Sequence, residues 1–205
     1  MAEEKISFHS GDLNLEGLLH NAPGERGVVL CHPHPLYGGD MSNNVVQSLA
    51  EAYQANNYST LRFNFRGVGA SEGTFDEGKG EQEDVGAALG YLSRLGLKHI
   101  DLTGYSFGAW VCALGLEKLE LADRLIMVSP PTNFMDFAFL GYNKKIQLVI
   151  VGMQDEIAGC QAIEELLPRW NPEAGFHPID GADHFYRGKT EELKRIMNGF
   201  LGHAH

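Results

Sequence analysis

The sequence predicts an α/β protein in which helices cover both faces of a mainly parallel sheet. Strand-like and helix-like segments alternate along the 205 residues, a pattern that implies right-handed crossovers between parallel strands. Some strand-like segments are continuous apolar runs, such as Gly-Val-Val-Leu-Cys at 27–31, as expected where helices cover both faces. A chain of this length buries about 70% of its unfolded surface, so we expect a single domain over residues 1–205.

The first half of the chain contains four expected strands and two expected helices. The strands cover residues 5–10, 13–20, 27–31 and 58–65, and the helices cover 44–56 and 82–95. Gly11-Asp12 joins the first two strands into an antiparallel hairpin. The first helix has apolar residues at helical spacing, and Ser42 or Asn43 is its expected N-cap.

The second half repeats the alternation with shorter segments. Its expected strands cover residues 98–103, 125–128, 146–151 and 176–179, and its helices cover 109–116, 162–167 and 191–201. With the first half, this gives eight strands. No repeat, low-complexity tract or linker interrupts the pattern.

Charge and composition exclude several classes of partner. The net charge is 16 − 27 = −11 and there is no cluster of Lys or Arg, so we expect neither nucleic acid nor an anionic membrane as a partner. No apolar run approaches the ~20 residues that span a bilayer, and the acidic N-terminus lacks a signal-peptide pattern. The odd number of cysteines without C-x-x-C spacing is typical of a reduced, cytoplasmic protein, which we expect to be a monomer or homodimer.

The most informative motif is Gly104-Tyr105-Ser106-Phe107-Gly108, which lies between an expected strand and an expected helix. A Gly-x-Ser-x-Gly in that context predicts a nucleophile elbow, a sharp turn that presents a serine hydroxyl above a sheet edge. The glycines allow strand and helix to cross closely around a strained serine. Ser106 is therefore the candidate nucleophile.

A second match to this motif occurs at Gly69-Ala70-Ser71-Glu72-Gly73. It follows a strand-like run but leads into a loop rather than a helix. Because the elbow needs the helix, Ser71 fails on context.

A serine hydroxyl needs a general base, which in turn is oriented by an acid. Ligands of parallel α/β sheets bind beyond the carboxyl ends of the strands, so both partners are sought in loops after later strands. Asp155 follows the strand at 146–151 and is the expected acid, with Glu156 as the fallback. His184 follows the last strand and is the expected base, which gives the chain order Ser, Asp, His.

An oxyanion needs two hydrogen-bond donors. The first expected donor is the backbone N–H of Phe107, at the start of a helix whose dipole favours negative charge. The second is expected from residues 32–39, His-Pro-His-Pro-Leu-Tyr-Gly-Gly. The two prolines there have no N–H, so His34 is the first choice for this amide and Leu36 the next.

Two other patterns have weaker interpretations. His32 and His34 suggest a metal site, but without a third ligand it is incomplete, so we expect no metal and no cofactor. His32 is instead expected to be a buried side chain that shapes the loop. Residues 73–80 nearly match a phosphate-binding loop, but the final Ser/Thr is missing and acidic residues crowd it. Arg62 and Arg66 are expected to pair with those carboxylates and fix the loop.

Together these residues resemble the α/β-hydrolase superfamily over nearly the whole chain, and most closely its small, lidless bacterial group of serine esterases related to dienelactone hydrolases. The motifs are His32-Pro-His-Pro-x-x-Gly-Gly39, Arg62-Phe-Asn-Phe-Arg-Gly-x-Gly69 with Ser71-Glu-Gly73, Gly104-x-Ser-Phe-Gly108, Asp155-Glu156 and Asp183-His184-Phe185. The resemblance implies the α/β-hydrolase fold with a mostly parallel eight-stranded sheet. It also implies a serine hydrolase that cleaves small carboxylic esters through an acyl-enzyme.

Two departures from neighbouring families are informative. Dienelactone hydrolases proper use a cysteine where this chain has Ser106, and capped lipases insert a helical lid where this chain has only residues 132–145. We therefore expect an open cleft without a cap domain. Its expected substrate-binding residues are Tyr37, Phe134, Phe137, Ile157 and Phe185. Further rim candidates, of which part should prove to be core, are Leu36, Phe107, Phe139, Leu140 and Tyr186.

Three functions remain open at this point. A small-molecule ester is the first candidate substrate. An amide, peptide or thioester would use the same three residues. A non-catalytic interaction module with the same scaffold is the third possibility, although such modules usually lack one of the three.

Overall fold

The computed structural model describes residues 3–202 and contains an eight-stranded sheet. The strands are β1 (Glu4–Ser10), β2 (Leu13–His20), β3 (Arg26–Cys31), β4 (Ser59–Phe63), β5 (His99–Tyr105), β6 (Arg124–Val128), β7 (Ile146–Gly152) and β8 (Gly175–Ile179). Their order across the sheet is β1-β2-β4-β3-β5-β6-β7-β8. β1 pairs with β2, and β2 with β4, in antiparallel register, whereas all other neighbours are parallel. The expected mostly parallel sheet is confirmed.

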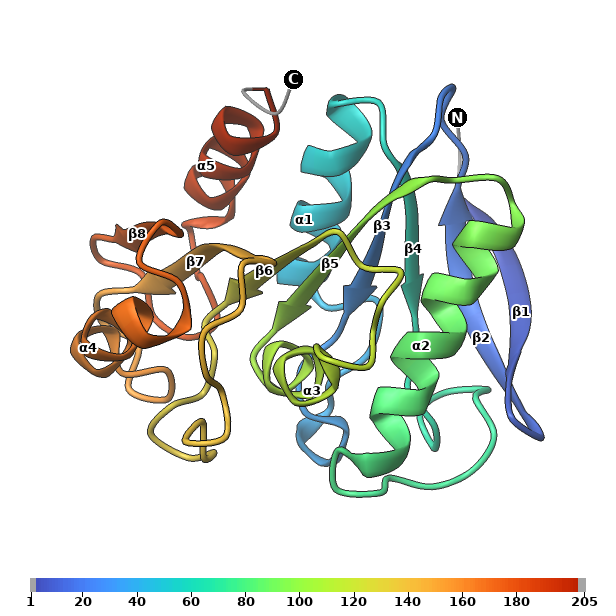
Figure 1. Ribbon diagram of the computed structural model, residues 1–205, viewed down its shortest axis with the longest axis horizontal. Helices are drawn as coiled ribbons and strands as arrows, with labels where there is room; N and C mark the ends of the chain where they lie inside the picture. The colour runs from blue at the N-terminus through green and yellow to red at the C-terminus, as the bar shows by residue number, and fades with distance from the viewer. Residues whose placement is uncertain (1–2, 203–205) are drawn as a thin grey trace.

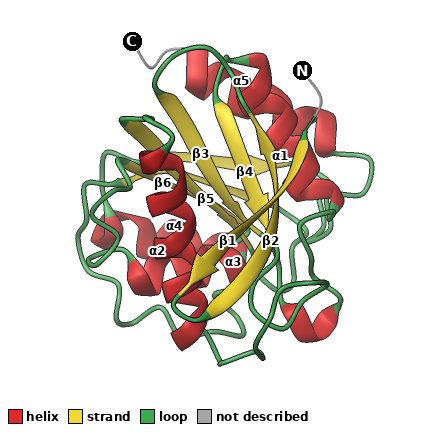
Figure 2. Cartoon of the chain, turned by 90° about the vertical axis from the view of Figure 1, so that its right-hand side faces the viewer, coloured by secondary structure: helices red, strands yellow, loops and turns green. Residues whose placement is uncertain are grey.

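Five α-helices cover the two faces of this sheet. They are α1 (Asn44–Ala55), α2 (Lys79–Arg94), α3 (Phe107–Gly115), α4 (Cys160–Trp170) and α5 (Thr190–Gly202), and a short 3-10 helix, η1 (Pro35–Tyr37), follows β3. Buried residues of α2, α3 and α4 share one hydrophobic core, and those of α1 and α5 share the other. Figures 1 and 2 show this layering, with the twisted sheet between the two groups of helices. Within residues 3–202, none of the helices is both long and apolar enough to cross a membrane.

Local sequence explains where the helices begin. Asn43, not Ser42, is the N-cap of α1, and its side-chain oxygen accepts the Val45 N–H at 2.9 Å. Helix α2 begins three residues earlier than expected because the Glu81 carboxylate accepts the N–H groups of Gly78 and Asp76, each at 2.8 Å. These side-chain contacts satisfy amides that a helix start otherwise leaves without partners.

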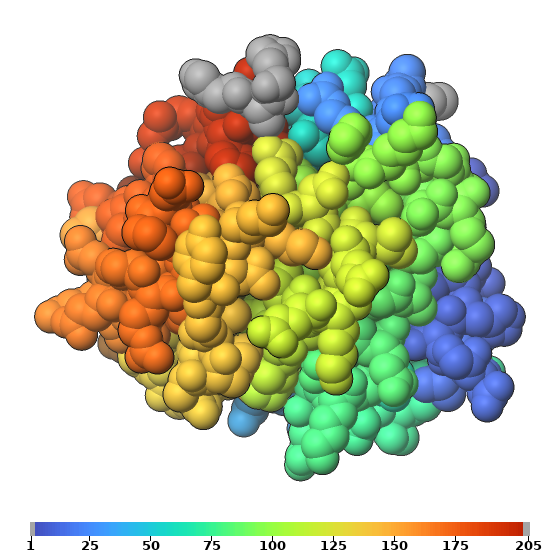
Figure 3. Space-filling model, viewed as in Figure 1, coloured from blue at the N-terminus to red at the C-terminus, as the bar shows by residue number. Residues whose placement is uncertain are grey.

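The segment between β6 and β7, residues 129–145, contains no helix or strand. Figure 3 shows the face of the molecule on which α2, α3 and α4 lie. Because residues 129–145 form neither helix nor strand, no folded cap domain is inserted between β6 and β7, as expected.

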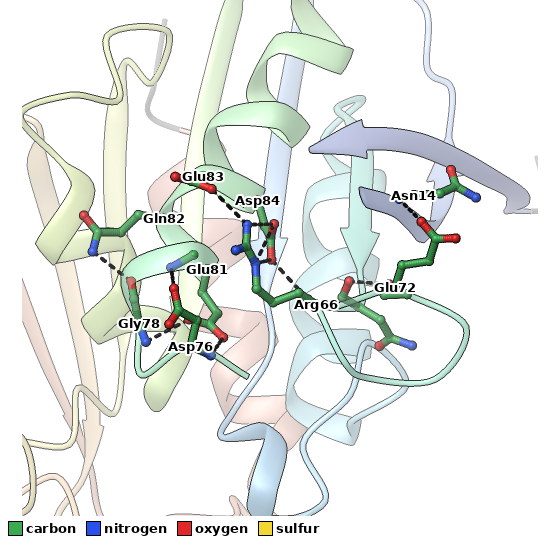
Figure 4. A network of polar contacts seen from close by, with 12 residues as sticks. Asn14, Arg66, Glu72, Asp76, Gly78, Glu81, Gln82, Glu83 and Asp84 are labelled. Atoms are coloured by element: carbon green, nitrogen blue, oxygen red, sulfur yellow. Dashed lines mark hydrogen bonds and ion pairs between the residues drawn. The ribbon is translucent and has the colours of Figure 1, made fainter. Parts of the chain in front are cut away.

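Figure 4 shows the polar network that fixes the loop between β4 and α2. The Arg66 guanidinium donates to the fully buried Asp84 through Nε and Nη2, the latter at 2.8 Å, and also reaches Glu83 at 3.2 Å. Arg66 therefore pairs with acidic residues next to this loop, as the sequence predicted. The expectation for Arg62 is wrong, because its guanidinium pairs with Glu3 and with the Met41 carbonyl instead.

Candidate active site

Ser106 occupies the turn between β5 and α3 with φ of 55°, a region that residues with a Cβ rarely adopt. A Cβ at Gly104 would overlap the backbone of Gly108, and a Cβ at Gly108 would overlap the Cys31 carbonyl. Both glycines are therefore required for α3 to start against the ends of β5 and β3. The sharp turn directs the serine hydroxyl away from the sheet.

Three side chains distant in sequence form one hydrogen-bonded chain at this turn. The Ser106 Oγ lies 2.9 Å from His184 Nε2, and His184 Nδ1 lies 2.9 Å from Asp155 Oδ2. The carboxylate accepts only, so Nδ1 carries the proton and Nε2 is free to accept the serine hydroxyl. Ser106, His184 and Asp155 are exposed by 7%, 7% and 5%, so these three hydrogen-bonded side chains lie just below the surface.

The Asp155 carboxylate is held by its own loop. Its Oδ1 accepts the N–H groups of Ile157 at 2.9 Å and Ala158 at 2.8 Å. Burial pushes the pKa of Asp155 upward, but the hydrogen bond and charge of His184, with the Ala158 N–H and the Ser129 hydroxyl, outweigh it and hold the pKa below its usual value. The fallback acid, Glu156, is exposed, and the hydrogen bonds of the His184 ring go to Asp155 and Ser106 instead.

His184 is also anchored from a residue that the sequence did not indicate. The hydroxyl of Tyr105, the residue directly before Ser106, donates to the His184 carbonyl at 2.7 Å and is buried. This bond ties the loop after β8 to the serine turn. Tyr105 could have been suspected only from its place inside the motif.

Both expected oxyanion donors have a backbone N–H without a hydrogen-bond partner within residues 3–202. They are Phe107, the first residue of α3, and His34, in the loop after β3. The alternative donor, Leu36, is engaged, because its N–H donates to His34 Nδ1 at 3.2 Å. Of the two amides expected from this loop, only that of His34 is left open.

His32 fixes the peptide that carries this amide. Its Nδ1 lies 2.6 Å from the Pro33 carbonyl, and its Nε2 accepts the Phe65 N–H at 3.1 Å. The Pro33 carbonyl and the His34 N–H belong to one planar peptide and point in opposite directions, so anchoring the first aims the second. Burial is the main cause that lowers the pKa of His32 to about 4, so the ring stays neutral and keeps both bonds. Its expected role in shaping the loop fits this geometry.

The expected rim of the cleft divides into exposed and buried residues. Tyr37, Phe134 and Phe185 are exposed by 88%, 75% and 47%, and Ile157 is partly exposed. Phe137 does not lie on an exposed rim, because its ring is buried against Trp170 and Phe139. The further candidates that are buried rather than on a rim are Phe107, Leu140 and Tyr186. Apolar character alone did not separate the two groups, since packing decides it.

An open hollow of about 590 Å³ lies beside the loop after β3. Its walls include Pro35 and Leu36 on one side and Val68, Thr74 and Phe75 on the other. None of the three hydrogen-bonded side chains lines it. The Phe75 ring connects this hollow to the two expected oxyanion donors. It packs against the rings of both His34 and Phe107, at 5.1 and 5.7 Å between ring centroids.

Comparisons with known proteins agree with this geometry. An α/β serine hydrolase homologue from Coxiella burnetii is 34% identical, with a TM-score of 0.91, and the match covers 98% of each chain. The chain belongs to the α/β-hydrolase superfamily. A serine hydrolase without a lid from Xanthomonas campestris matches 98% of this chain and 94% of its own, with 28% identity and a TM-score of 0.89, which places the chain in the lidless group.

One curated relative is similarly distant. An uncharacterized protein of Rickettsia prowazekii is 35% identical over 96% of this chain and 88% of its own length. No family model matches the chain. The assignment to the lidless group therefore rests on the solved lidless structure, and any statement about the reaction rests on the residues of this chain.

Proposed function

We propose that this α/β hydrolase cleaves small, uncharged or weakly charged carboxylic esters through an acyl-enzyme on Ser106. The observation that carries the proposal is the contact between the Ser106 hydroxyl and His184 Nε2, with Nδ1 of the same ring on Asp155. The similarity to serine hydrolases from two bacteria supports it.

The proposed reaction follows the hydrogen bonds. Ser106 Oγ attacks the ester carbonyl carbon while its proton moves to His184 Nε2. Asp155, kept ionised by its donors, stabilises the resulting imidazolium and holds its tautomer. The Nε2 proton then passes to the leaving alcohol, and the acyl group stays on Oγ. A water molecule, activated by the same nitrogen, releases the acid and restores the hydroxyl.

The negative charge of the tetrahedral intermediate is assigned to the N–H groups of Phe107 and His34. Each such donor is typically worth about 3 kcal/mol of transition-state stabilisation. His32 is the positioning residue for the second donor, since it fixes the Pro33 carbonyl of the same peptide.

The charge of the protein and the exposed rings near His184 support an uncharged substrate. The chain has a net charge of −11, which disfavours anionic esters. Exposed aromatic rings suit an apolar group, and the Phe185 ring stands edge-on to His184 at 5.6 Å between centroids. With no lid to open, the rate should rise smoothly with substrate concentration and show no jump at the solubility limit.

Rapid mixing with p-nitrophenyl acetate tests the proposal. An acyl-enzyme predicts a burst of p-nitrophenol of about one equivalent per protein before the steady state, and no burst from Ser106→Ala. Parallel assays with the matching anilide separate ester from amide chemistry. Faster cleavage of the anilide, or no turnover of either compound, would refute ester hydrolysis.

A further inference from the structure

The open hollow of about 590 Å³ lies between two loops that follow neighbouring parallel strands. One wall is the loop after β3, with Pro35 and Leu36, and the other is the loop after β4, with Val68 and Phe75. Because β3, β4 and β5 are parallel, both loops leave the same edge of the sheet as Ser106. The volume falls within the roughly 300–1,000 Å³ of small-molecule sites. The hollow can therefore hold part of a substrate.

Glycines keep this hollow free of side chains. Five of its lining residues are Gly38, Gly39, Gly67, Gly69 and Gly73. A Cβ at Gly38 would meet no atom within 4 Å, so the space beside it is open. A ligand there would contact peptide backbone and the apolar side chains of the two walls, a surface that suits an uncharged group.

Hydrogen bonds hold both walls in place. In the loop after β3, the Gly39 N–H donates to the His34 carbonyl at 3.0 Å. The loop after β4 is tied to α2, because the Asp76 N–H donates to the Glu81 carboxylate at 2.8 Å (Figure 4). Both walls are preorganised, so a bound group need not order them.

The hollow borders the expected oxyanion donors. Phe75, which lines it, packs against the rings of His34 and Phe107, the two residues whose N–H groups are open. Pro35 and Leu36 directly follow His34 in the chain. A carbonyl oxygen held by these two N–H groups therefore has one substituent of its carbon next to the hollow.

The order of the strands decides which part of an ester enters. Ser106 follows β5, and the hollow lies on the β3 and β4 side of that strand. Asp155 and His184 follow β7 and β8, on the other side. The oxygen of the leaving alcohol must stay within reach of His184 Nε2, which gives it a proton. The acyl group is therefore the substituent directed toward the hollow.

We propose that the hollow is the acyl subsite of this hydrolase and takes an uncharged, apolar acyl group longer than acetyl. Leu36 and Val68 form its apolar walls, and the Asp40 carboxylate, which also lines it, repels acidic acyl groups. The proposal rests on the proposed function, because the reaction at Ser106 sets the direction of the acyl group.

A series of p-nitrophenyl esters from acetate through butyrate and hexanoate to octanoate tests the length of the acyl group at constant leaving group. We expect kcat/KM to rise by about two- to fourfold per methylene until the hollow is filled. Each rate is divided by that of hydroxide on the same ester, which removes differences in intrinsic reactivity. A parallel series of alkyl acetates lengthens the alcohol instead. A flat acyl profile, or a steeper rise with alcohol length, would overturn the assignment.

Leu36→Asn replaces part of the apolar wall by a polar side chain of similar size. It keeps the backbone N–H that donates to His34 Nδ1. The ratio of kcat/KM for hexanoate to that for acetate should fall by about three- to tenfold. Leu121→Asn is the matched control, because this exposed leucine precedes β6, at the opposite edge of the sheet, and should leave the ratio unchanged. No fall in folded Leu36→Asn, or an equal fall in the control, would contradict the subsite.

Asp40→Asn tests the charge at the hollow. An amide oxygen can still accept the Ser42 N–H, which Asp40 Oδ1 accepts at 2.7 Å. The p-nitrophenyl monoester of adipic acid should gain about three- to tenfold in kcat/KM relative to the hexanoate, since both acyl chains have the same length. Glu117→Gln is the control, because it removes an exposed carboxylate between α3 and β6. An equal gain in both variants would reduce the effect to net charge and overturn the role of Asp40.

A binding measurement without turnover separates failure of the subsite from failure of the proposed function. In Ser106→Ala, methyl hexanoate should shift the backbone NMR signals of Leu36, Val68 and Thr74 more than methyl acetate does. If wild-type protein cleaves no ester but these signals move, the proposed function fails and the subsite stands. If esters are cleaved while the signals stay fixed and acyl length has no effect, the subsite fails and ester hydrolysis stands.

Discussion

The two Gly-x-Ser-x-Gly segments of this chain have the same pattern and opposite environments. Ser106 and Ser71 are almost equally buried, at 7% and 6% exposure, so access to solvent does not distinguish them. Their partners do. The Ser106 hydroxyl contacts an imidazole, whereas the Ser71 hydroxyl donates to the Asn64 carbonyl at 2.7 Å and accepts the Glu16 N–H at 3.1 Å.

The difference shows what the motif does and does not determine. Glycines permit a sharp turn at both serines. Only the turn at Ser106 joins a strand to a helix at the sheet edge where His184 lies. At Ser71 both partners are backbone groups, which join the loop after β4 to β2. That hydroxyl serves structure, and no base lies in hydrogen-bond contact with it among residues 3–202.

The largest expected effect is that of Ser106→Ala. Removing the hydroxyl leaves no nucleophile, so kcat/KM for p-nitrophenyl acetate should fall by on the order of 10⁴–10⁶. Steady-state kinetics of purified, folded variant measures it. If kcat/KM fell by less than about tenfold, Ser106 would not be the nucleophile, and its contact with His184 would not distinguish it from Ser71.

Asp155→Asn should cost nearly as much. The neutral amide oxygen of Asn accepts the His184 Nδ1 proton without the negative charge that stabilises an imidazolium. If the side-chain amide flipped, its NH₂ group would face the N–H groups of Ile157 and Ala158. We expect kcat to fall by about 10³–10⁴ with a folded protein, as for wrong-tautomer variants of other triads. Glu156→Gln is the control, and equal losses in both variants would contradict the assignment of the acid.

His32→Ala should have an intermediate effect. It frees the Pro33 carbonyl and the Phe65 N–H, so the His34 amide loses its fixed direction. Since one oxyanion donor is worth about 10²–10³ in kcat, a partial loss of about 10–100-fold is expected, with KM little changed. A rise in KM alone would place His32 in substrate binding instead.

The free energy of unfolding should depend on pH through the ionisation of Asp155. Its pKa is lowered in the folded protein, so the ionised carboxylate stabilises the fold above the usual pKa of an aspartate, and this contribution is lost as the pH falls through the lowered value. Denaturant unfolding should therefore show the largest difference between wild type and Asp155→Asn near neutral pH, closing in acid. A difference that grows in acid would contradict the sign.

The smallest effect on activity is expected from Ser71→Ala. The partly buried Glu16 N–H loses its acceptor, which should lower the free energy of unfolding by about 1 kcal/mol. Turnover of the folded protein should stay within about twofold of wild type, because the hydroxyl takes no part in the chemistry. A large loss of kcat at unchanged stability would give Ser71 a role that its contacts do not.

Sequence reasoning predicted the sheet, the helices and the three side chains that meet at the turn. It could do so because hydrophobic periodicity marks the elements and parallel strands end at one edge. Contacts that depend on packing were not predictable in this way. Phe137 has the character of a rim residue and is core, and the partner of Arg62 proved to be Glu3, which the periodic pattern does not bring near it.

Mapping the adduct of a fluorophosphonate probe by mass spectrometry tests the central claim most directly. The probe reports which serine is activated, without any choice of substrate. The hydrogen bonds of the two serines predict a single phosphonylated peptide that contains Ser106, and none when His184 is changed to Gln. An adduct on Ser71, or an unmodified Ser106 in folded wild-type protein, would contradict it.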